Sequence, residues 1–394
     1  MTTFVFVNKS CYRRQEEIAM VRRFLFMNGF AEDADLAKAD LAILFTCAFC
    51  QSRVADMLEE IGRIRSVIKD ECELIVGSCL PETDKAGLEN VFSGKTITPT
   101  DFTALNRLPG ITVKIEELPK RFGKDTAYAP SMTHPSPGPP EPALPLEQDA
   151  AGPGSGQSMG VFISSGCLGQ CSYCAIRFAT GRLRSKPLDV VTRTLSEGLD
   201  QGYRRFEIYA DSMGDYGLDI GADLGDLFDW MAKSPGGFSV GIHDLHPHAF
   251  VKFFGKILSL CQAGRIHYLY VPLQSANPRI LKLMNRPCDV KALLEKLLKV
   301  RTFDGVFLQT SIIVGFPSET DGEFEETLAF LEAIRFSDVY VHCYSDMPNT
   351  ESSQLPDKID KAMMRRRLNR LERAGIHYND EKARHELEMI PSLG

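Results

Sequence analysis

A proline-rich segment divides this chain of 394 residues into two parts. Residues 129–157 hold eight of the 22 prolines, together with four glycines. Proline lacks a backbone donor and fixes φ, so the stretch 135–142 can form neither a helix interior nor a central strand. We therefore predict a spacer at 129–157 between an N-terminal domain (1–128) and a larger domain (158–385), with a short tail at 386–394.

Before the spacer, short apolar runs alternate with stretches of helical periodicity. Strands are expected at 4–7, 41–46 and 74–76, and helices at 15–28 and 53–68. This alternation predicts a small doubly wound, flavodoxin-like α/β domain with a parallel sheet.

One cysteine follows each of these three strands: Cys11, Cys47 and Cys79. A single buried cysteine is most often a small hydrophobic residue. In a parallel sheet, however, the loops after the strands meet at one edge, where ligands bind. The shared position therefore predicts a three-cysteine site. Cys50 and Cys72 do not follow a strand in this way; Cys50 completes a C-x-x-C with Cys47 and is a bystander or a substitute ligand.

After the spacer, the alternation of strands and helices continues. Strands are expected at 159–164, 205–210, 239–242, 268–273, 305–314 and 338–344, with helices such as 188–202, 290–301 and 322–334 between them. About six β/α units predict a partial TIM-type barrel, because a closed eight-fold barrel needs about 250 residues. Active sites in such barrels lie at the carboxyl ends of the strands.

The loop after the first barrel strand carries Cys167, Cys171 and Cys174 in the spacing C-x3-C-x2-C, with Tyr173 before the third cysteine. Three thiolates can hold three irons of a [4Fe–4S] cluster and leave the fourth iron open to a small molecule. Gly166 and Gly169 allow the backbone to pass close to a cluster. A structural zinc loop is the alternative, but zinc usually takes four ligands, and no Cys or His follows within the next twenty residues.

Composition fits an enzyme of a reducing compartment. The chain has 11 cysteines, no secretory signal is evident at its start, and no apolar run reaches the length of about 18 residues that spans a bilayer. We therefore expect a cytoplasmic protein with no membrane contact. The net charge of −7 supplies no general attraction for nucleic acid, although the basic run 361–370, expected as an exposed helical face, offers a local one.

The order of motifs along nearly the whole chain resembles the radical S-adenosylmethionine (SAM) methylthiotransferases. The matching segments are Cys11, 46–48 and 77–81 for the N-terminal cluster, 165–174 for the SAM-cluster loop, 181–187, 271–275 and 283–286 in the barrel, and 313–320 with 324–327 near its end. Together these segments are far more specific than any one of them.

The resemblance implies two [4Fe–4S] clusters and S-adenosyl-L-methionine. One cluster, on Cys167, Cys171 and Cys174, would bind SAM, and its reduction would release a 5′-deoxyadenosyl radical that abstracts hydrogen from an unactivated carbon. The second cluster, on Cys11, Cys47 and Cys79, would deliver sulfur to that carbon. Such an enzyme needs a reduced flavodoxin- or ferredoxin-type electron donor and a sulfur donor. Both clusters should face one closed cavity, because the carbon radical must meet sulfur before solvent.

Further site residues follow from the same resemblance and from the strand-end rule. Six side chains are expected near SAM: Tyr173, Asp211, Gln274, Ser275, Gly315 and Pro317. Arg184 and His243 are expected to contact substrate, and Arg184 with Lys186 to steady the cluster loop. The role of Cys343 stays open.

Several departures bear on the substrate. Asp211 and Ser212 stand where the family has Gln-Asp or Gln-Asn, and 344–350 lacks the family's arginine. The family usually ends in an RNA-binding TRAM-type domain, which we do not expect after Gly394. We therefore predict sulfur insertion into a non-tRNA substrate, such as a natural-product nucleoside, another small molecule or a peptide. The alternatives are a tRNA or ribosomal-protein methylthiotransferase without that domain, and a non-catalytic iron–sulfur or zinc scaffold.

Overall fold

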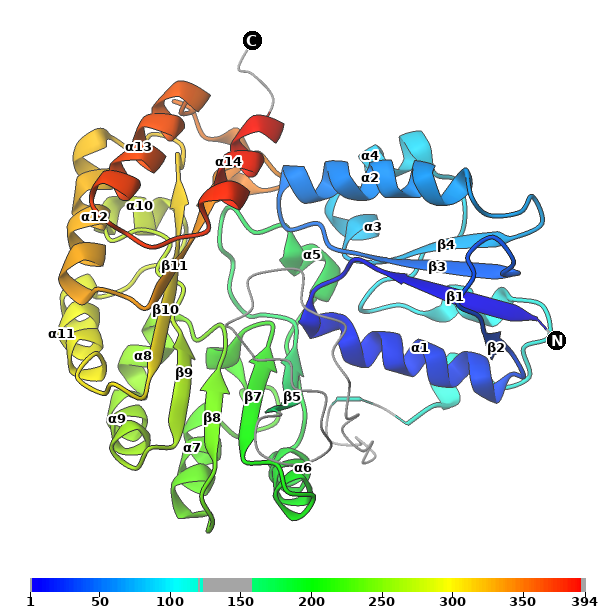
Figure 1. The fold of residues 1–394 in the computed structure, drawn as a ribbon, viewed down its shortest axis with the longest axis horizontal. Coiled ribbons are helices and arrows are strands. Elements are labelled where there is room, and N and C mark those ends of the chain that lie inside the picture. Colours follow the sequence, from blue (N-terminus) through cyan, green and yellow to red (C-terminus); the bar gives the residue numbers. More distant parts are fainter. Residues whose placement is uncertain (1, 120, 123–157, 391–394) are drawn as a thin grey trace.

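The computed structural model describes residues 2–119, 121–122 and 158–390. The predicted spacer at 129–157 lies outside the described residues. Figure 1 shows the described residues as two α/β units, with a small sheet on one side and a larger, curved sheet on the other.

The first unit is a four-stranded parallel sheet in the order β2-β1-β3-β4. Its strands are β1 (Thr3–Asn8), β2 (Ala31–Glu32), β3 (Leu41–Thr46) and β4 (Glu73–Ser78). Helix α1 (Gln15–Met27) covers one face, and α2 (Gln51–Arg65) with α3 (Leu80–Thr83) and α4 (Lys85–Val91) covers the other (Figure 1). Because β3 is buried along its whole length, its continuous apolar run fits a central parallel strand. The predicted doubly wound domain is confirmed.

The second unit is a seven-stranded sheet in the order β11-β10-β9-β8-β7-β5-β6. Its strands are β5 (Ser158–Ser165), β6 (Arg184–Ser185), β7 (Arg205–Ala210), β8 (Ser239–Ile242), β9 (Ile266–Tyr270), β10 (Phe307–Val314) and β11 (Asp338–Cys343). Every neighbouring pair is parallel except β5 and β6. Six parallel strands in an open sheet confirm the predicted partial barrel.

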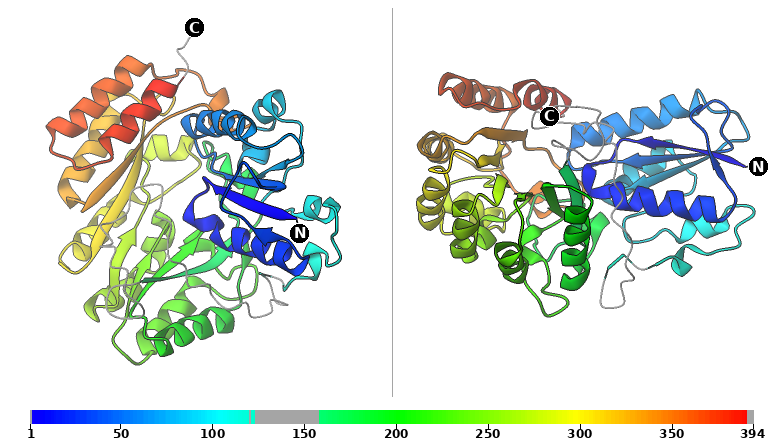
Figure 2. Two further views of the ribbon diagram at one scale, coloured as in Figure 1. Left: turned by 45° about the vertical axis from the view of Figure 1, so that its right-hand side comes forward. Right: turned by 60° about the horizontal axis from the view of Figure 1, so that its bottom comes forward.

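Helices line the outer side of this curved sheet, as Figure 2 shows. They are α6 (Leu188–Asp200), α7 (Leu224–Lys233), α8 (Pro247–Lys252), α9 (Phe254–Gln262), α10 (Pro278–Leu283), α11 (Val290–Val300) and α12 (Asp321–Ile334). One large hydrophobic cluster fills the space between helices and strands, and it takes alternate residues of each strand, such as Phe206 and Ile208 of β7. The residues between them therefore lie on the inner face of the barrel.

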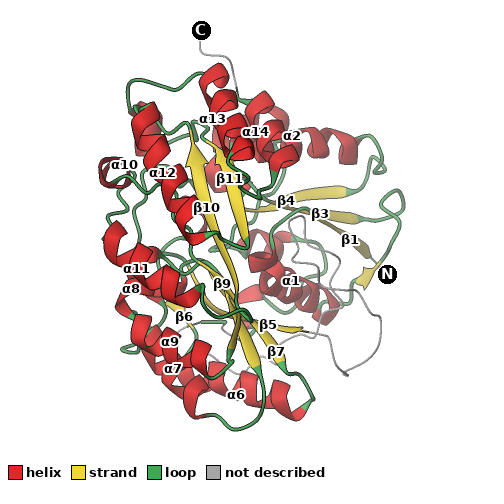
Figure 3. Cartoon of the chain, turned by 60° about the vertical axis from the view of Figure 1, so that its left-hand side comes forward, coloured by secondary structure: helices red, strands yellow, loops and turns green. Residues whose placement is uncertain are grey.

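Two elements join the units. The short helix α5 (Ile176–Thr180) belongs to the barrel chain, yet Ala175 and Ala179 pack in the same hydrophobic cluster as Val54 and Leu80 of the small domain. At the other end, α13 (Lys361–Arg373) leads to α14 (Asp380–Met389), which lies beside both β11 and α2 (Figure 3). Helix α14 extends past the predicted tail boundary at residue 386, because Glu386 and Leu387 are buried.

No helix in the described parts of the chain is long and apolar enough to span a bilayer.

Candidate functional site

The first cysteine triplet lies at the carboxyl edge of the small sheet. Cys47 and Cys79 follow β3 and β4 directly, and Cys11 precedes the short 3-10 turn η1 (Tyr12–Arg14). The thiols of Cys11 and Cys47 form a hydrogen bond, and both lie close enough to Cys79 to interact electrostatically. The structure therefore brings together the three cysteines that the sequence pattern predicted.

The electrostatics of this triplet favour one thiolate. The hydrogen bond from Cys47, together with the charges of Arg13 and Arg14, lowers the pKa of Cys11 to about 5 in spite of burial. Burial instead raises the pKa of the Cys79 thiol well above its usual range. Because the thiolate is the form that binds metal, Cys11 is ready as a ligand at neutral pH.

A side-chain bridge holds this edge of the sheet together, and one residue of the edge has a strained backbone. The Thr46 hydroxyl donates to the carbonyl of Gly77 (2.6 Å) and accepts from the amide of Leu80 (3.1 Å), which fixes the ends of β3 and β4 against each other. Ser78, next to Cys79, has φ of 76°, a conformation that costs a non-glycine residue energy. Such strain is concentrated at functional sites in proteins.

The second triplet lies in the loop after β5. At Gly166 the φ angle is 79°, and a β-carbon there would lie 2.2 Å from the carbonyl oxygen of Arg182, so only glycine fits. The amide of Cys167 donates to the carbonyl of Gly181 (3.2 Å), and Arg286 reaches the sulfur of Cys171 (Nη1 to Sγ, 3.6 Å). The loop is thus held from both sides while Cys167, Cys171 and Cys174 stay partly accessible.

Buried polar atoms without a partner occur beside both triplets. Among the described residues they include Nε of Arg13 and Arg14, Oγ of Ser78 and Ser164, Oε1 of Gln274 and Nε of Arg286. Buried polar atoms in proteins are normally paired, so these atoms suit polar groups that bind between the triplets.

Both triplets fit iron–sulfur clusters by their donor chemistry, since each offers thiols that are free of disulfides. Within the described ranges, no three His, Cys, Asp or Glu side chains converge as the ligands of a single metal ion would. The cysteines of a four-iron cluster hold a larger inorganic core and need not converge on one point.

The residues expected near SAM fall into two groups. Tyr173 packs on the cluster of Ile280 and Phe316, which places it beside the end of β10, where Gly315 (φ 87°) and buried Pro317 follow the strand. Gln274 has φ of 73° and donates to the Ser311 hydroxyl (3.1 Å).

Ser275 is fully buried, and its hydroxyl bonds Thr327 of α12 (3.3 Å). Because that contact is directed at a helix, we assign Ser275 a structural role.

The inner face of the barrel carries a carboxylate between two imidazoles. Glu207 of β7 bonds Nε2 of His243 and Nε2 of His267, each at 2.8 Å. Burial opposes the charge on Glu207, but these hydrogen bonds lower its pKa to about 2. The predicted substrate residue His243 is therefore oriented by a buried acid.

Aromatic rings continue this face up to the first triplet. Tyr12, the neighbour of Cys11, lies 4.5 Å from Tyr209 between ring centroids; Tyr209 lies 4.4 Å from His243, and His243 lies 4.5 Å from Tyr268. These four rings, which we call the aromatic wall, join the small domain to the mouth of the barrel.

Asp211 and Arg184 both contact the second loop. Asp211 accepts from the Gly166 amide (2.9 Å) and the Ser165 hydroxyl (3.2 Å). Arg184 reaches the same Ser165 hydroxyl (3.5 Å) and the carbonyl of Pro99 in the small domain (3.3 Å). Arg184 thus links the small domain to the end of β5, where the loop begins; its expected contact with substrate stays a prediction.

The cysteines outside the triplets, and arginines of the basic run 361–370, contact other groups of the protein. Cys50 precedes α2 and bonds Ser52 (3.2 Å), Cys72 lies at the opposite end of β4, and buried Cys343 donates to the carbonyl of Ala383. Three arginines of α13 form ion pairs: Arg365 with Glu388, Arg370 with Glu325, and buried Arg367 with Glu319. Arg365, Arg366 and Arg370 are exposed, so the run presents the exposed helical face that was predicted, while Arg367 packs inside.

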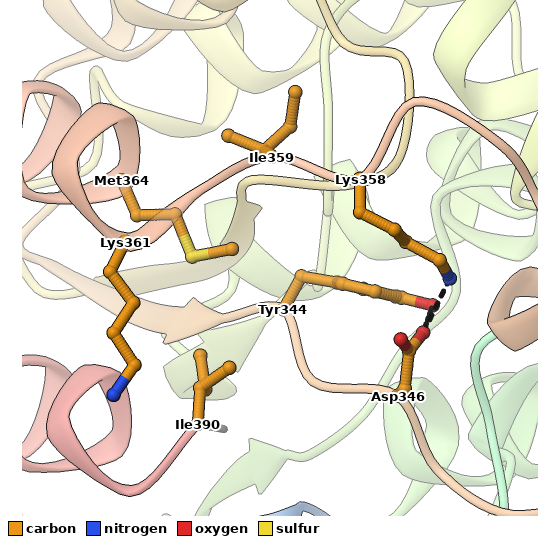
Figure 4. Close-up of a pocket in the computed structure, with 7 residues that line it drawn as sticks. All are labelled: Tyr344, Asp346, Lys358, Ile359, Lys361, Met364 and Ile390. Carbon is orange, nitrogen blue, oxygen red and sulfur yellow. Dashed lines mark hydrogen bonds and ion pairs between the residues drawn. The ribbon is translucent and has the colours of Figure 1, made fainter. Parts of the chain in front are cut away.

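A small pocket lies beside these C-terminal helices. Figure 4 shows its lining, in which Lys358 and Tyr344 converge on Asp346. Tyr344 also packs in the same hydrophobic cluster as Tyr173 of the second loop.

Sequence patterns alone missed Arg14, Tyr12 and Glu207. Their only signals were the run Tyr-Arg-Arg directly after Cys11 and an acidic residue inside an apolar strand.

Two sequence families match the chain. The family described as Radical SAM superfamily matches residues 161–331, which include the second triplet, and uncharacterized protein family UPF0004 matches residues 3–98, which include the first.

Named relatives match in addition. The threonylcarbamoyladenosine tRNA methylthiotransferase MtaB of Thermotoga maritima is 33% identical over 52% of this chain and 48% of its own length. The ribosomal protein uS12 methylthiotransferase RimO of Chlamydia felis is 27% identical over 94% of this chain and 77% of its own. The tRNA-2-methylthio-N(6)-dimethylallyladenosine synthase of Syntrophomonas wolfei is 28% identical over 92% and 79%.

Among solved structures, the radical SAM methyltransferase TsrM of Kitasatospora setae has a TM-score of 0.60 at 14% identity, covering 89% of this chain and 77% of that one. This likeness supports the fold of both units together.

Proposed function

Because this chain belongs to the radical SAM methylthiotransferase family, we propose that it inserts a methylthio group into a nucleoside of tRNA. The observation that carries the proposal is the pair of cysteine triplets, one in each unit, joined by the contacts of the turn after Cys11 with the barrel. An enzyme of this family uses SAM and a [4Fe–4S] cluster.

The prediction of a non-tRNA substrate is wrong. Relatives that cover nine tenths or more of the chain are named as methylthiotransferases of tRNA or of ribosomal protein uS12. The expected small-molecule or peptide partner and the non-catalytic scaffold are set aside for the same reason.

Each triplet has a distinct role in this proposal. Cys167, Cys171 and Cys174 would hold the SAM-binding cluster, and Cys11, Cys47 and Cys79 a second cluster. When bound, these groups supply one-electron cleavage of SAM and the sulfur that is inserted. The reaction also needs a one-electron reductant of flavodoxin or ferredoxin type and a source of sulfur.

In this proposal the protein's own residues orient SAM and shield the site from water. Tyr173, Gly315 and Pro317 form the side of the mouth where SAM would lie, and Gln274 offers an unpaired amide oxygen there. The domain contact through α5 excludes water from one side of the mouth, because Ala175 and Ala179 are buried in it.

The aromatic wall favours a nucleoside over a peptide carboxylate. Proteins that read single nucleotides stack bases on Tyr, Phe and His rings, and Tyr12, Tyr209, His243 and Tyr268 offer such rings in a row from the turn after Cys11 to β9. The wall would hold a base while the buried Glu207 keeps the His243 ring fixed.

Cluster content tests the chemistry. After anaerobic reconstitution we expect about eight irons in the wild type and about four in each triple variant, as two four-iron clusters require. The variants are Cys167→Ala/Cys171→Ala/Cys174→Ala, which should also lose reductive SAM cleavage, and Cys11→Ala/Cys47→Ala/Cys79→Ala, which should keep it. An N-terminal variant with unchanged iron would end the two-cluster proposal.

Deletion of the gene tests the substrate. We expect methylthio-nucleosides in hydrolysed tRNA to fall in the deletion strain and to return with the wild-type gene, measured by mass spectrometry. Purified enzyme should bind tRNA with an affinity that decreases steeply as salt rises. If ribosomal protein uS12 loses mass instead and tRNA is unchanged, the nucleoside assignment is wrong.

A further inference from the structure

The turn η1 sends consecutive side chains from the first triplet into the barrel domain. Directly after Cys11, Tyr12 donates to Asp244 (3.0 Å), Arg13 pairs with the same carboxylate (2.7 Å), and Arg14 pairs with Asp211. Asp211 and Asp244 follow the neighbouring strands β7 and β8. Two similar ion pairs, one residue apart, therefore cross between the domains at the same place.

The Arg14 pair is the buried one. The side chains of Arg14, Glu17 and Asp211 are 1%, 1% and 4% exposed, and Arg14 bonds Glu17 through Nη1 (2.6 Å) and Asp211 through Nη2. In the Arg13 pair the corresponding exposed fractions are 25% and 14%. A guanidinium forks in a fixed plane, so Arg14 holds the two carboxylates at a fixed separation.

Asp211 connects Arg14 to the segment that leads into the second triplet. One of its oxygens faces Arg14, and the other accepts from the Gly166 amide (2.9 Å) and the Ser165 hydroxyl (3.2 Å), directly before Cys167. A continuous chain of bonds thus runs from Arg14, three residues after Cys11, through Asp211 to the loop that carries Cys167. Within the part of the chain that the structure describes, the carboxylate of Asp244 bonds Tyr12 and Arg13 and has no such bond to the loop of Cys167.

Stability alone does not explain a buried group in which Arg14 pairs with two acids, one of which, Glu17, also lies 4.0 Å from Arg121. Desolvation of buried charges often offsets their attraction, and apolar replacements of such groups are frequently neutral or stabilising. What the buried group provides is a fixed geometry between the segments that it joins.

We propose that Arg14 is a positioning residue that couples the two cysteine triplets, so that the order of each cluster loop depends on the other. The coupling rests on the proposed two-cluster function. Arg14 is continuous in sequence with Cys11, and through Asp211 it fixes the backbone before Cys167. Neither residue needs to touch substrate for this role.

The first test isolates the second triplet. In the Cys11→Ala/Cys47→Ala/Cys79→Ala background, only the Cys167 set can hold a cluster, and its visible absorbance can be followed under an anaerobic EDTA challenge. We expect Arg14→Lys and Asp211→Asn to lose the cluster about 10-fold faster, the range found when residues that orient metal ligands are changed. Asp244→Asn, the matched control, should change the rate less than about twofold, because it leaves the bonds to the loop intact.

The second test runs in the opposite direction. In the Cys167→Ala/Cys171→Ala/Cys174→Ala background, Asp211→Asn should speed loss of iron from the Cys11 set by a similar factor, although Asp211 bonds none of those cysteines. Faster loss from both sets is expected if the Arg14–Asp211 pair holds both loops in place.

Three outcomes would overturn the coupling: an equal effect of Asp244→Asn, which would mean that any domain contact suffices; an effect of Asp211→Asn on its own loop alone; or no effect at all. Arg14→Lys keeps the charge, and circular dichroism on each variant identifies any that fail to fold. If Arg14→Lys fails to fold, Asp211→Asn decides the proposal.

Iron content separates the coupling proposal from the proposed two-cluster function. About four irons in each background with uncoupled kinetics would leave the two-cluster function standing, whereas a missing cluster would remove both.

Discussion

At Gly166 the chain passes closer to itself than a side chain would permit. The left-handed φ of 79° and the Arg182 carbonyl both exclude a β-carbon, and the loop of Cys167 begins at this position. A change here therefore acts on the cluster loop itself.

We expect Gly166→Ala to lose most of the iron held by the Cys167 set, because the loop must move to relieve the contact. Gly110→Ala is the control, since Gly110 has the same φ of 79° and nothing within 4 Å of a β-carbon. The control should cost only the backbone term of about 1 kcal/mol and keep its iron. Iron analysis and thermal unfolding of both variants decide this, and equal iron loss in the two would show that the contact with Arg182 is irrelevant.

Among the elements, β7, β8 and β9 are joined by the single carboxylate of Glu207. Its two hydrogen bonds reach His243, after β8, and His267 in β9. A folded-state pKa of about 2, against a usual value of 4.5, means that the ionised form stabilises the folded protein. This contribution is complete above about pH 4.5 and is lost as the pH falls towards 2.

The shift corresponds to about 3 kcal/mol of stability between those pH values. We therefore expect the free energy of unfolding of the metal-free protein to fall less steeply with acid in Glu207→Gln than in the wild type. Urea unfolding at several pH values measures this. Glu89→Gln, on the exposed face of α4, should leave the slope unchanged. If the free energy of unfolding of Glu207→Gln changes with pH as steeply as that of the wild type, another acid controls stability between pH 2 and 4.5.

Most elements could be predicted because their hydrophobic periodicity is strong. The strands 41–46, 205–210 and 239–242 were predicted with their observed bounds. The strands β2 and β6 were missed, since two residues carry no periodicity and their pairing depends on neighbours distant in sequence.

The residues of the candidate site could likewise be predicted only in part. The six cysteines could be found from spacing and strand order, because parallel strands place their following loops at one edge. Arg14 could not, since its partner Asp211 is 197 residues away and no local pattern records such a pair. Ser275 shows the converse: its place at a strand end suggested a ligand contact, but the hydroxyl is used to hold α12.

At the scale of the whole molecule, α14 connects the last strand of the barrel to the small domain, because it contacts both β11 and α2. Leu387 and Ala383 are buried, and Glu386 bonds the backbone amide of Cys343 at the end of β11 (3.1 Å). Gln51 of α2 reaches the carbonyl of Asp346 nearby (2.8 Å).

Removal of residues 379–394 should therefore lower stability by about 3 kcal/mol or more, the value of burying two such apolar side chains with their neighbours. Differential scanning calorimetry should show the midpoint falling by several degrees, for both domains together. Met389→Ala, at an exposed position of α14, is the control and should change the midpoint little. Separate transitions in the truncated protein would also locate the interface that α14 maintains.

The position of α5 has a consequence for how the protein matures in the cell. The helix begins two residues after Cys174 and completes a hydrophobic cluster whose other members, apart from Met347, come from the small domain. Domains generally fold in order of synthesis, so the ribosome releases a small domain with a vacant apolar surface before the barrel exists. Iron–sulfur delivery to Cys167 must then compete in time with the docking of α5. A shortage of iron during translation should leave a folded, closed protein that is harder to load afterwards than the nascent chain.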